Sequence, residues 1–534
     1  MGLSYMASAR PPVHIPNESL TFPLRKAAES FPEKIAVIEP EAGGREWTYA
    51  ELEERSSGLA ASLNSLGVEA GDRVGVWLKN SVEYILSFYG ILKAGAVVVP
   101  VSTHHGEREV TAQLAVTKAR AIIAAQDQYR QVCSLEGKAA IRIAVTENGE
   151  VPAGPGLTSF SSLLDGRKQF DRSIDCDPHE TLAVLPFSSG TTGLPKGVML
   201  THANLIANLH QVQQAHKIGP DDVMLNQLPF FHIYGMTVLM GSAILAGAKQ
   251  VLASRFRPVD EFLGLFTRYR PTLFLTVPLV LKEFCQSPLV PKMDWSSMRH
   301  FNSGGAPLSP EIQERLAGLT GVPVTQGYGL TESSPTTHVV PLDAIKTGRI
   351  GTPLSLTEHK IVDPVTQSVV PVGEVGELWV RGPQVMKGYY NDPKSSSNTL
   401  VDGWLLTGDL AKQDEDGYVC IVDRLKELIK CKGFQVAPAE IEHVLHGHPG
   451  ILDAAVIGEP HPVFGEVPVA YVVVQKGSGL SGEAVIEYAA QGMAKYKRLA
   501  KVVLIDAIPR SPSGKILRRV LKDAQRLRRE AEGV

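Results

Sequence analysis

Apolar runs and amphipathic segments alternate along the first two-thirds of the chain. Arg73–Leu78 and Val97–Val101 are apolar runs of strand length, and Ser81–Lys93 between them carries its apolar residues at helical spacing. A strand, a helix and a second apolar strand form a βαβ unit, which favours a parallel sheet with both faces covered. The same pattern predicts further strands at Ala36–Ile38, Glu46–Thr48, Ala121–Ala124, Ile141–Val145, Ala183–Phe187 and Thr272–Val277. The predicted fold class is therefore α/β.

Local signals place several helices in this region. Thr48 and Glu51 have the spacing of a capping box, which predicts a helix that ends near Gly67. Thr201 caps a second helix, in which Leu205, Leu209 and Val212 recur at helical spacing. Gly235–Ala248 is the most apolar long run, but it is too short to cross a membrane and predicts a buried helix.

The pattern changes near residue 350. Short strands separated by turns follow, at Lys360–Val362, Glu377–Arg381, Leu405–Thr407 and Tyr418–Val422, and they predict a small β subdomain. The last part of the chain mixes helices and strands. It predicts strands at Ala454–Ile457, Ala470–Val474 and Val502–Ile505. It also predicts three helices: one that begins at Pro438, one over Val485–Gln491 and one over Ile516–Ala531.

A domain boundary is predicted between the β subdomain and this last part. The run Asp423–Lys426 is polar, short and free of Gly and Pro, which suits a hinge between defined positions better than a flexible linker. We therefore expect an N-terminal domain over residues 1–423, a hinge at 424–426 and a C-terminal domain over 427–534.

The composition narrows the class of protein. The chain has 534 residues, 44% hydrophobic and 20% charged, with a net charge of −3. These values are ordinary for a soluble globular protein, and the net charge argues against a general nucleic-acid binder. Five irregularly spaced cysteines and an N-terminus without an apolar signal segment favour a reducing, cytoplasmic location. No C-terminal peroxisomal tripeptide follows the last helix. We expect at most peripheral membrane contact, and a monomer or a homodimer.

The segment Leu185–Lys196 (LPFSSGTTGLPK) is the strongest candidate for a ligand-binding loop. Small residues, hydroxyls and one Lys lie between two strand-like runs, so backbone N–H groups, hydroxyls and Lys196 could all contact phosphate oxygens. It is not a Walker A loop, because Lys196 is followed by Gly197 and not by Ser or Thr. A flexible surface loop is the alternative interpretation.

Five further segments each allow a functional and a structural interpretation. They are FFHIYG with His232, QGYGLTE ending at Glu332, WLLTGD ending at Asp409, DRLKELIKCKGFQV beginning at Asp423, and PRSPSGK ending at Lys515. Taken one at a time, they could be a packed histidine, a tight turn, a strand end, a solvated charged face and a surface lysine.

Taken together and in this order, the glycine loop and the later segments resemble the adenylate-forming superfamily of acyl-CoA synthetases, adenylation domains and luciferases. The resemblance extends from about residue 20 to about residue 525. It is strongest toward the branch of 4-coumarate–CoA ligases and medium- or long-chain fatty acid–CoA ligases. It implies a large N-terminal domain of two α/β subdomains plus a small β barrel, followed by a mobile α+β C-terminal domain.

The implied reaction joins a carboxylic acid to CoA through an acyl-adenylate, with ATP, Mg²⁺ and CoA as the small molecules required. The acid and ATP are both anionic, and like charges about 4 Å apart repel by roughly 4 kcal/mol at an effective dielectric of about 20. The resemblance assigns Mg²⁺ to Glu332, the α-phosphate to Thr331, and the bridge between carboxylate and α-phosphate to Lys515. The implied ATP- and AMP-binding residues are Ser188, Ser189, Gly190, Thr191, Thr192, Lys196, Gly305, Ala306, Pro307, Gln326, Gly327, Tyr328, Asp409, Arg424 and Gln435.

The second half-reaction needs a different arrangement. By resemblance, the C-terminal domain rotates about Lys426, so that Lys515 leaves the site and Lys430 approaches it. The implied CoA-binding residues are Arg255, Lys432, Gly433 and Phe434. The implied acyl-pocket residues are Tyr234, Gly304, Gly329 and Val339, with His232 as a gate.

The sequence leaves the acid open. We favour a medium- or long-chain fatty acid, because several glycines leave depth in the predicted pocket and no polar group obviously awaits a ring hydroxyl. A 4-coumarate-like aromatic acid is the main competing interpretation. The pattern also leaves open a carrier-loading acyl-AMP ligase, a luciferase-like oxygenase and a non-enzymatic nucleotide-binding protein.

Overall fold

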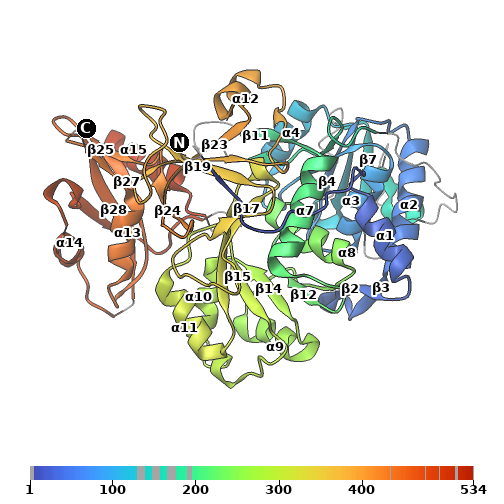
Figure 1. Cartoon of the computed structure of the whole chain (residues 1–534), viewed down its shortest axis with the longest axis horizontal. Helices are drawn as coiled ribbons and strands as arrows, with labels where there is room; N and C mark the ends of the chain where they lie inside the picture. The colour runs from blue at the N-terminus through green and yellow to red at the C-terminus, as the bar shows by residue number, and fades with distance from the viewer. Residues whose placement is uncertain are drawn as a thin grey trace. The chain divides into compact units, whose positions relative to one another are not determined.

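The computed structural model describes residues 5–128, 139–146, 157–164, 176–188, 195–432, 434–475, 477–491, 493–510 and 515–532. Contacts divide the chain into two units (Figure 1). The larger unit holds Ala7–Glu358 and Arg381–Leu405, and the smaller unit holds Met1–Met6, His359–Val380 and Leu406–Val534. The predicted hinge at 424–426 lies inside the smaller unit, and its role in movement stays a prediction.

The first sheet of the larger unit has the strand order β10-β11-β9-β5-β4-β6-β7-β8, and β21 pairs with β11. Its strands from β9 to β8 are parallel, which confirms the predicted βαβ unit. The predicted strand Ala183–Phe187 is divided in two, because Pro186 has no N–H to donate to a neighbouring strand. The bounds are β4 (Arg73–Trp77), β5 (Val97–Pro100), β6 (Ala121–Ala125), β7 (Ile141–Val145), β8 (Leu157–Ser159), β9 (Leu182–Val184), β10 (Phe187–Ser188), β11 (Lys196–Thr201) and β21 (Gly388–Tyr389).

The second sheet of the larger unit has the order β18-β17-β16-β15-β14-β12-β13-β2-β3. Its strands from β16 to β2 are parallel, so the loops after their carboxyl ends gather at one edge, where open α/β sheets bind ligands. The bounds are β2 (Ile35–Glu39), β3 (Arg45–Thr48), β12 (Val223–Asn226), β13 (Lys249–Leu252), β14 (Leu273–Thr276), β15 (His300–Ser303), β16 (Val324–Gly329), β17 (Thr336–Val339) and β18 (Thr352–Pro353).

Three helices of the larger unit, α2, α3 and α7, begin within one residue of the positions that the sequence predicts. Glu51 accepts from the backbone N of Thr48 at 2.7 Å, and Thr48 accepts from the backbone N of Glu51 at 3.2 Å, which confirms the capping box. Thr201 likewise accepts from the backbone N of Asn204 at 3.2 Å. The bounds are α1 (Phe22–Ser30), α2 (Tyr49–Ser65), α3 (Val82–Lys93), α4 (Glu107–Thr117), α6 (Phe160–Leu164), α7 (His202–His216), α8 (Ser242–Ala246), α9 (Val259–Tyr269), α10 (Pro278–Gln286), α11 (Pro310–Thr320) and α12 (Pro393–Thr399).

The apolar run predicted as one buried helix has an unexpected geometry. Its first part, Tyr234–Gly241, is a π-helix, and α8 continues it directly. Gly235 faces the preceding turn so closely that an added Cβ would lie 2.2 Å from the carbonyl oxygen of Pro229. Short π-helical segments are rare and occur often at functional sites.

The smaller unit carries the predicted β-rich segment and the C-terminal α+β part. One sheet runs β1-β19-β20-β23-β22, where β22 is Leu400–Val401 and β24 pairs with β23. The other runs β26-β25-β28-β27, with β29 beside β28. Among the described residues, no helix combines the length and apolarity needed to cross a membrane. The strand bounds are β1 (Met6–Ala7), β19 (Glu358–Val362), β20 (Gly376–Arg381), β23 (Trp404–Gln413), β24 (Val419–Arg424), β25 (Ile429–Cys431), β26 (Phe434–Val436), β27 (Ile451–His461), β28 (Gly465–Val474) and β29 (Lys501–Leu504). The helix bounds are α13 (Pro438–His446), α14 (Gly482–Ala490) and α15 (Arg518–Glu532).

Candidate active site

Some of the predicted site residues lie in the larger unit and the others in the smaller unit. The larger unit holds the glycine loop, the QGYGLTE segment and the predicted acid pocket. The smaller unit holds Asp409, Arg424, the hinge and both candidate lysines, Lys430 and Lys515.

The glycine loop is closed at its base by a hairpin. Phe187 pairs with Gly197 and Ser188 pairs with Lys196, so β10 and β11 hold the two ends of the loop side by side. The predicted phosphate-binding residues Ser189, Gly190, Thr191 and Thr192 lie outside the described residues. The hairpin therefore fixes the ends of the loop, and the phosphate role of its middle stays a prediction.

Lys196 has two partners at this base. Its ammonium donates to the Ser395 hydroxyl at 2.7 Å and lies 5.0 Å from the centre of the Tyr389 ring. Tyr389 comes close because β21 pairs with β11, where Val198 lies opposite Tyr389. Sequence reasoning missed both Ser395 and Tyr389, because no motif marks the segment that contains them.

Tyr389 also connects this base to Glu332. The Tyr389 hydroxyl donates to Oε1 of Glu332 at 2.9 Å. Burial and, after it, the negative charge of Glu332 raise the pKa of the Tyr389 hydroxyl, so it stays protonated and acts as a donor. Lys196 and Glu332, which come from two separate sequence motifs, are thus joined through one aromatic side chain.

A tight turn presents Thr331 and Glu332. They lie in a short 3₁₀ helix, η5 (Thr331–Ser333), which packs against β10 and β11. The turn needs a glycine before it, because a Cβ on Gly329 would lie 2.0 Å from the carbonyl oxygen of Pro335. The strands at the base of the glycine loop and the end of the QGYGLTE segment are therefore in contact.

The predicted adenine-binding segments follow two neighbouring parallel strands. Ser303 at the end of β15 pairs with Gln326 on β16. The Gln326 side chain accepts from the backbone N of Leu308 at 2.6 Å and donates to the carbonyl of Arg349 at 3.0 Å. Gln326 thereby fixes the loop that carries Gly305, Ala306 and Pro307. In the structure its amide binds the backbone of Leu308 and Arg349. The contacts of these residues, and of Gly327 and Tyr328, with a nucleotide stay predictions.

The segments predicted to line the acid pocket contain a buried polar pair, although the sequence showed no polar group that obviously awaits a ring hydroxyl. The Tyr234 hydroxyl lies 3.4 Å from Oδ1 of Asn302, and both residues are buried. Two glycines adjoin this pair: a Cβ on Gly304 would lie 3.2 Å from the Tyr234 hydroxyl, and one on Gly327 would lie 3.6 Å from Oδ1 of Asn302. The same Cβ on Gly327 would lie 3.4 Å from Val339. Two glycines and the aliphatic side chain of Val339 therefore lie around the hydrogen-bonding pair Tyr234 and Asn302.

His232, the predicted gate, lies just before the π-helix. Its Nδ1 accepts from the backbone N of Tyr234 at 3.2 Å, and its side chain is partly exposed. A neutral imidazole that accepts at Nδ1 carries its proton on Nε2. Arg255, a predicted CoA contact, is exposed on the larger unit and lies 3.7 Å from Glu261.

In the smaller unit, Asp409 and Arg424 form an ion pair. They lie opposite each other on β23 and β24, with Nε of Arg424 3.0 Å from Oδ1 of Asp409. The Asp409 side chain is only 4% exposed, and the backbone N of the preceding Gly408 donates to Glu377 at 2.9 Å. Both predicted nucleotide contacts are therefore held in one fixed arrangement.

The predicted CoA-binding residues form a hairpin. Lys430 pairs with Gln435, and Cys431 pairs with Phe434, across β25 and β26. Lys430, Lys432, Phe434 and Gln435 are exposed, and Gly433 lies outside the described residues. Lys432 lies 4.3 Å from the Phe464 ring centre, and Phe434 stacks on Tyr496 at 4.4 Å. This exposed, aromatic-supported hairpin suits contact with a ligand.

Lys515 is anchored far from that hairpin. It precedes Ile516, which forms a bridge with Arg510, and Arg510 pairs with Asp453 near the start of β27. Lys430, by contrast, lies beside Glu466, near the turn that ends β27 at His461. At about 3.3 Å per residue, the strand from Asp453 to His461 spans roughly 25 Å. The two candidate lysines are thus held toward opposite ends of one ribbon.

The residues present suit a single bound Mg²⁺ better than a metal cluster. Within the described ranges, no group of three or more His, Cys, Asp or Glu side chains could hold a metal ion. Mg²⁺ usually binds one or two carboxylates together with phosphates and waters, so one carboxylate beside a phosphate loop is sufficient. Glu332, oriented by Tyr389, fits that requirement.

Comparison with known proteins shows which family the chain resembles. Residues 24–390 match the family model described as AMP-binding enzyme, and residues 440–515 match the AMP-binding enzyme C-terminal domain. The chain is 37% identical to 4-coumarate–CoA ligase 2 of Nicotiana tabacum, over 96% of this chain and 94% of the relative.

Two solved structures share the fold. ATP-bound MatB from Rhodopseudomonas palustris has a TM-score of 0.88 and 30% identity, covering 95% of this chain and 99% of its own. The anthranilate CoA ligase AuaEII, in complex with anthranoyl-AMP, has a TM-score of 0.88 and 26% identity, covering 98% of this chain and 99% of its own.

Proposed function

The chain belongs to the AMP-binding enzyme family and is an AMP-forming acid–CoA ligase, and from that premise we propose that its acid is aromatic, of the 4-coumarate class. The ligase activity agrees with the prediction from the sequence. The fatty acid favoured there is less well supported than the aromatic acid, because two of the similar proteins act by name on 4-coumarate and anthranilate.

The observation that carries the proposal is the buried pair Tyr234 and Asn302. A saturated acyl chain offers no hydrogen bond to a buried hydroxyl and amide, so methylenes around them would leave Tyr234 and Asn302 with only their protein partners, each other and Thr325. A ring hydroxyl can donate to Oδ1 of Asn302 or accept from Tyr234. The glycines beside this pair let Tyr234 and Val339 approach the backbone closely, since a Cβ on Gly304 or Gly327 would lie within 3.4 Å of them.

For the first half-reaction we propose that the carboxylate of the acid attacks the α-phosphorus of ATP and that pyrophosphate leaves. Lys196 and the glycine loop would hold the leaving phosphates, with Lys196 positioned by Ser395 and Tyr389. Glu332 would hold Mg²⁺, which supplies positive charge when bound. Lys515 would bring its ammonium to the α-phosphate, where negative charge develops.

For the second half-reaction we propose that the smaller unit presents a different face. The separation of Lys515 and Lys430 along the β27–β28 ribbon supports this division of labour, because one placement of the ribbon could not bring both to the same atoms. The hairpin with Lys432 and Phe434 would then contact CoA, while Lys515 moves away from the reacting atoms.

Thioester formation across a panel of acids tests the proposed acid class. Cinnamate, 4-coumarate and benzoate are compared with C6–C18 fatty acids, at saturating ATP, Mg²⁺ and CoA. We expect kcat/KM for 4-coumarate to exceed that of every fatty acid by about tenfold, the discrimination that one hydrogen bond of about 1.5 kcal/mol gives. A fatty acid as the best substrate would contradict the proposal.

A variant sharpens the test. Tyr234→Phe removes the hydroxyl and keeps the ring, so we expect it to lower kcat/KM for 4-coumarate about tenfold and to change that for cinnamate, which lacks the ring hydroxyl, by less than about threefold. Equal losses with both acids would show that Tyr234 does not recognise the hydroxyl.

A further inference from the structure

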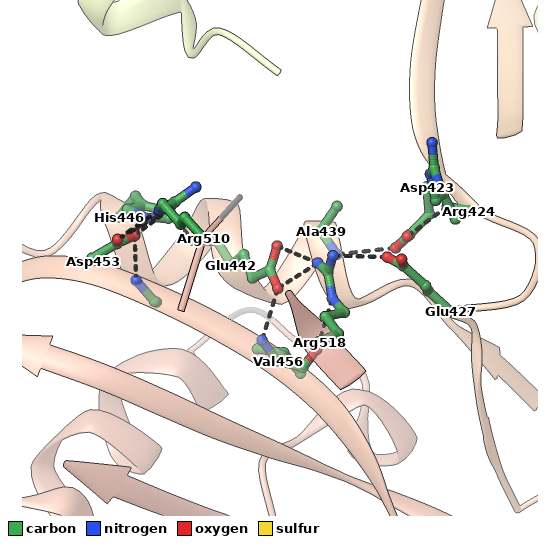
Figure 2. Close-up of polar contacts among 11 residues, drawn as sticks. Asp423, Arg424, Glu427, Ala439, Glu442, His446, Asp453, Val456, Arg510 and Arg518 are labelled. Carbon is green, nitrogen blue, oxygen red and sulfur yellow. Dashed lines mark hydrogen bonds and ion pairs between the residues drawn. The ribbon is translucent and has the colours of Figure 1, made fainter. Parts of the chain in front are cut away.

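A partly buried guanidinium lies at the first residue of α15, three positions after Lys515. The Arg518 side chain is 15% exposed and forms ion pairs with two carboxylates, those of Glu427 and Glu442 (Figure 2). These partners belong to two different elements, the turn after β24 and helix α13. Arg518 therefore joins three segments that are separate in the sequence.

The pair with Glu442 fixes Arg518 to the core of the smaller unit. Nη2 of Arg518 lies 2.6 Å and 2.8 Å from the two carboxylate oxygens of Glu442. Glu442 in turn accepts from the backbone N of Val456 at 2.7 Å, and Nε of Arg518 donates to the Val456 carbonyl at 3.3 Å. Arg and Glu side chains that share partners in this way have little freedom to move.

The pair with Glu427 reaches the predicted hinge. Nη1 of Arg518 lies 2.7 Å from Oε2 of Glu427, the residue that follows Lys426. The backbone N of Glu427 donates to the Arg424 carbonyl at 2.9 Å, so the turn continues directly from the strand that carries the Asp409–Arg424 pair. The Arg518 side chain, three residues after Lys515, thus contacts the turn Arg424–Glu427, here called the hinge turn.

A second guanidinium holds the other side of the Lys515 segment. Arg510 pairs with Asp453 through Nη2 at 2.8 Å and 3.0 Å, and His446 lies 3.4 Å from the same carboxylate. Burial acts to raise the pKa of Asp453, but hydrogen bonds from His446 and Arg510 outweigh it and hold the pKa at about 2. The carboxylate therefore stays charged, and Lys515 lies between two fixed arginine anchors.

We propose that Arg518 is a positioning residue that ties the Lys515 segment to the hinge turn through Glu427. The two anchors have different roles in this proposal: Arg510 fixes Lys515 to the β27–β28 ribbon only, whereas Arg518 links the same segment to the residue beside Lys426. Movement at the hinge and placement of Lys515 are then one event. This inference rests on the role proposed above for Lys515 in adenylate formation.

Glu427→Gln is the most selective test. It removes the negative charge that Glu427 offers to Arg518 and leaves the Arg518–Glu442 ion pair in place. We expect acid-dependent ATP–pyrophosphate exchange, which needs Lys515, to fall at least tenfold. Thioester formation from supplied acyl-adenylate and CoA, which does not need Lys515, should change by less than threefold. Arg518→Lys, whose single ammonium cannot bridge both carboxylates, should show the same division.

Arg519→Gln is the matched control. It removes one guanidinium from the next position of the same helix, but its side chain is 76% exposed and lies 3.8 Å from Asp523. We expect both half-reactions to stay within twofold of wild type. The double variant Glu427→Gln with Arg518→Lys should lose no more exchange activity than the worse single variant, because both changes break one link.

Equal losses in the two half-reactions, or a loss in exchange no larger than that of Arg519→Gln, would overturn the positioning role. Failure of the proposed acid class gives a different result: wild type would exchange best with a fatty acid of the panel, and the Arg518 variants are then compared with that acid. If Lys515→Ala left exchange unchanged, the proposed role of Lys515 would fail, and the inference about Arg518 would be refuted with it.

Discussion

Replacing Tyr389 by Phe removes one hydroxyl from the link between Lys196 and Glu332 and leaves the ring in place. The hydroxyl donates to Glu332 at 2.9 Å, while the ring lies 5.0 Å from the Lys196 ammonium. The substitution therefore separates the two functions of the side chain. Lys196 keeps its aromatic neighbour, and Glu332 loses a donor that orients its carboxylate.

The structure bounds the size of the effect. Tyr389 is 8% exposed, so water does not readily replace the lost hydroxyl. A hydrogen bond to a charged group contributes about 1.5–3 kcal/mol, which corresponds to roughly tenfold to a hundredfold in an equilibrium constant. Loss of a residue that orients a metal ligand weakens metal binding by a similar factor, about tenfold to a hundredfold. We expect the Mg²⁺ concentration for half-maximal activity to rise about tenfold.

Acid-dependent ATP–pyrophosphate exchange, measured over a series of free Mg²⁺ concentrations, reports this shift. At saturating Mg²⁺ the variant should recover most of the wild-type rate, because the ring and Lys196 are unchanged. Tyr390→Phe is the control, since it removes the same atom from the adjacent residue. An unchanged Mg²⁺ dependence in Tyr389→Phe, or an equal shift in Tyr390→Phe, would refute the role of the hydroxyl.

Three further predictions concern other parts of the chain. Lys515→Ala should lower adenylate formation by about 10²-fold or more and spare thioester formation from supplied adenylate; equal losses in the two assays would contradict this. Burial raises the pKa of Asp423 to about 6 in the folded chain. Its ionised form therefore costs stability, and wild type should gain about 1 kcal/mol in the free energy of unfolding as the pH falls from about 7.5 to about 5. Thermal unfolding compared with Asp423→Asn, which lacks this contribution, measures the gain, and parallel pH profiles would exclude it. An added Cβ on Gly235 would lie 2.2 Å from the Pro229 carbonyl, whereas one on Gly264, inside α9, would meet nothing within 4 Å. Gly235→Ala should thus destabilise the fold by about 2–3 kcal/mol and Gly264→Ala stabilise it by up to about 1 kcal/mol in denaturant unfolding, and equal effects would contradict the geometry.

Local physics made much of the fold predictable. The capping box at Thr48 and Glu51 depends on residues three positions apart, and the strand–helix–strand pattern over Arg73–Val101 depends on periodicity within one window. The pairing of the glycine loop with Glu332 was also expected, since both motifs belong to one resemblance. In the structure they meet because η5 packs against β10 and β11.

The features that the sequence did not reveal depend on long-range pairing or on small differences in backbone geometry. Tyr389 lies in a segment without a motif, and only the pairing of β21 with β11 brings it between Lys196 and Glu332. The π-helix at Tyr234–Gly241 has the same apolar pattern as an α-helix, so hydropathy alone does not distinguish them. Asn302 ends up beside Tyr234 because parallel strands bring their carboxyl ends to one edge.

The smaller unit is discontinuous in sequence, and this has a consequence for recombination between related genes. Its chain is drawn from His359–Val380 as well as from Leu406–Val534, and β23 pairs with β24 across the predicted hinge boundary at residue 423. A hybrid enzyme joined between residues 423 and 424 would inherit Asp409 from one parent and Arg424 from the other. Hybrids of two homologues should therefore stay active more often when His359–Val380 and Leu406–Val534 are transferred together, because both members of the Asp409–Arg424 ion pair then come from the same parent.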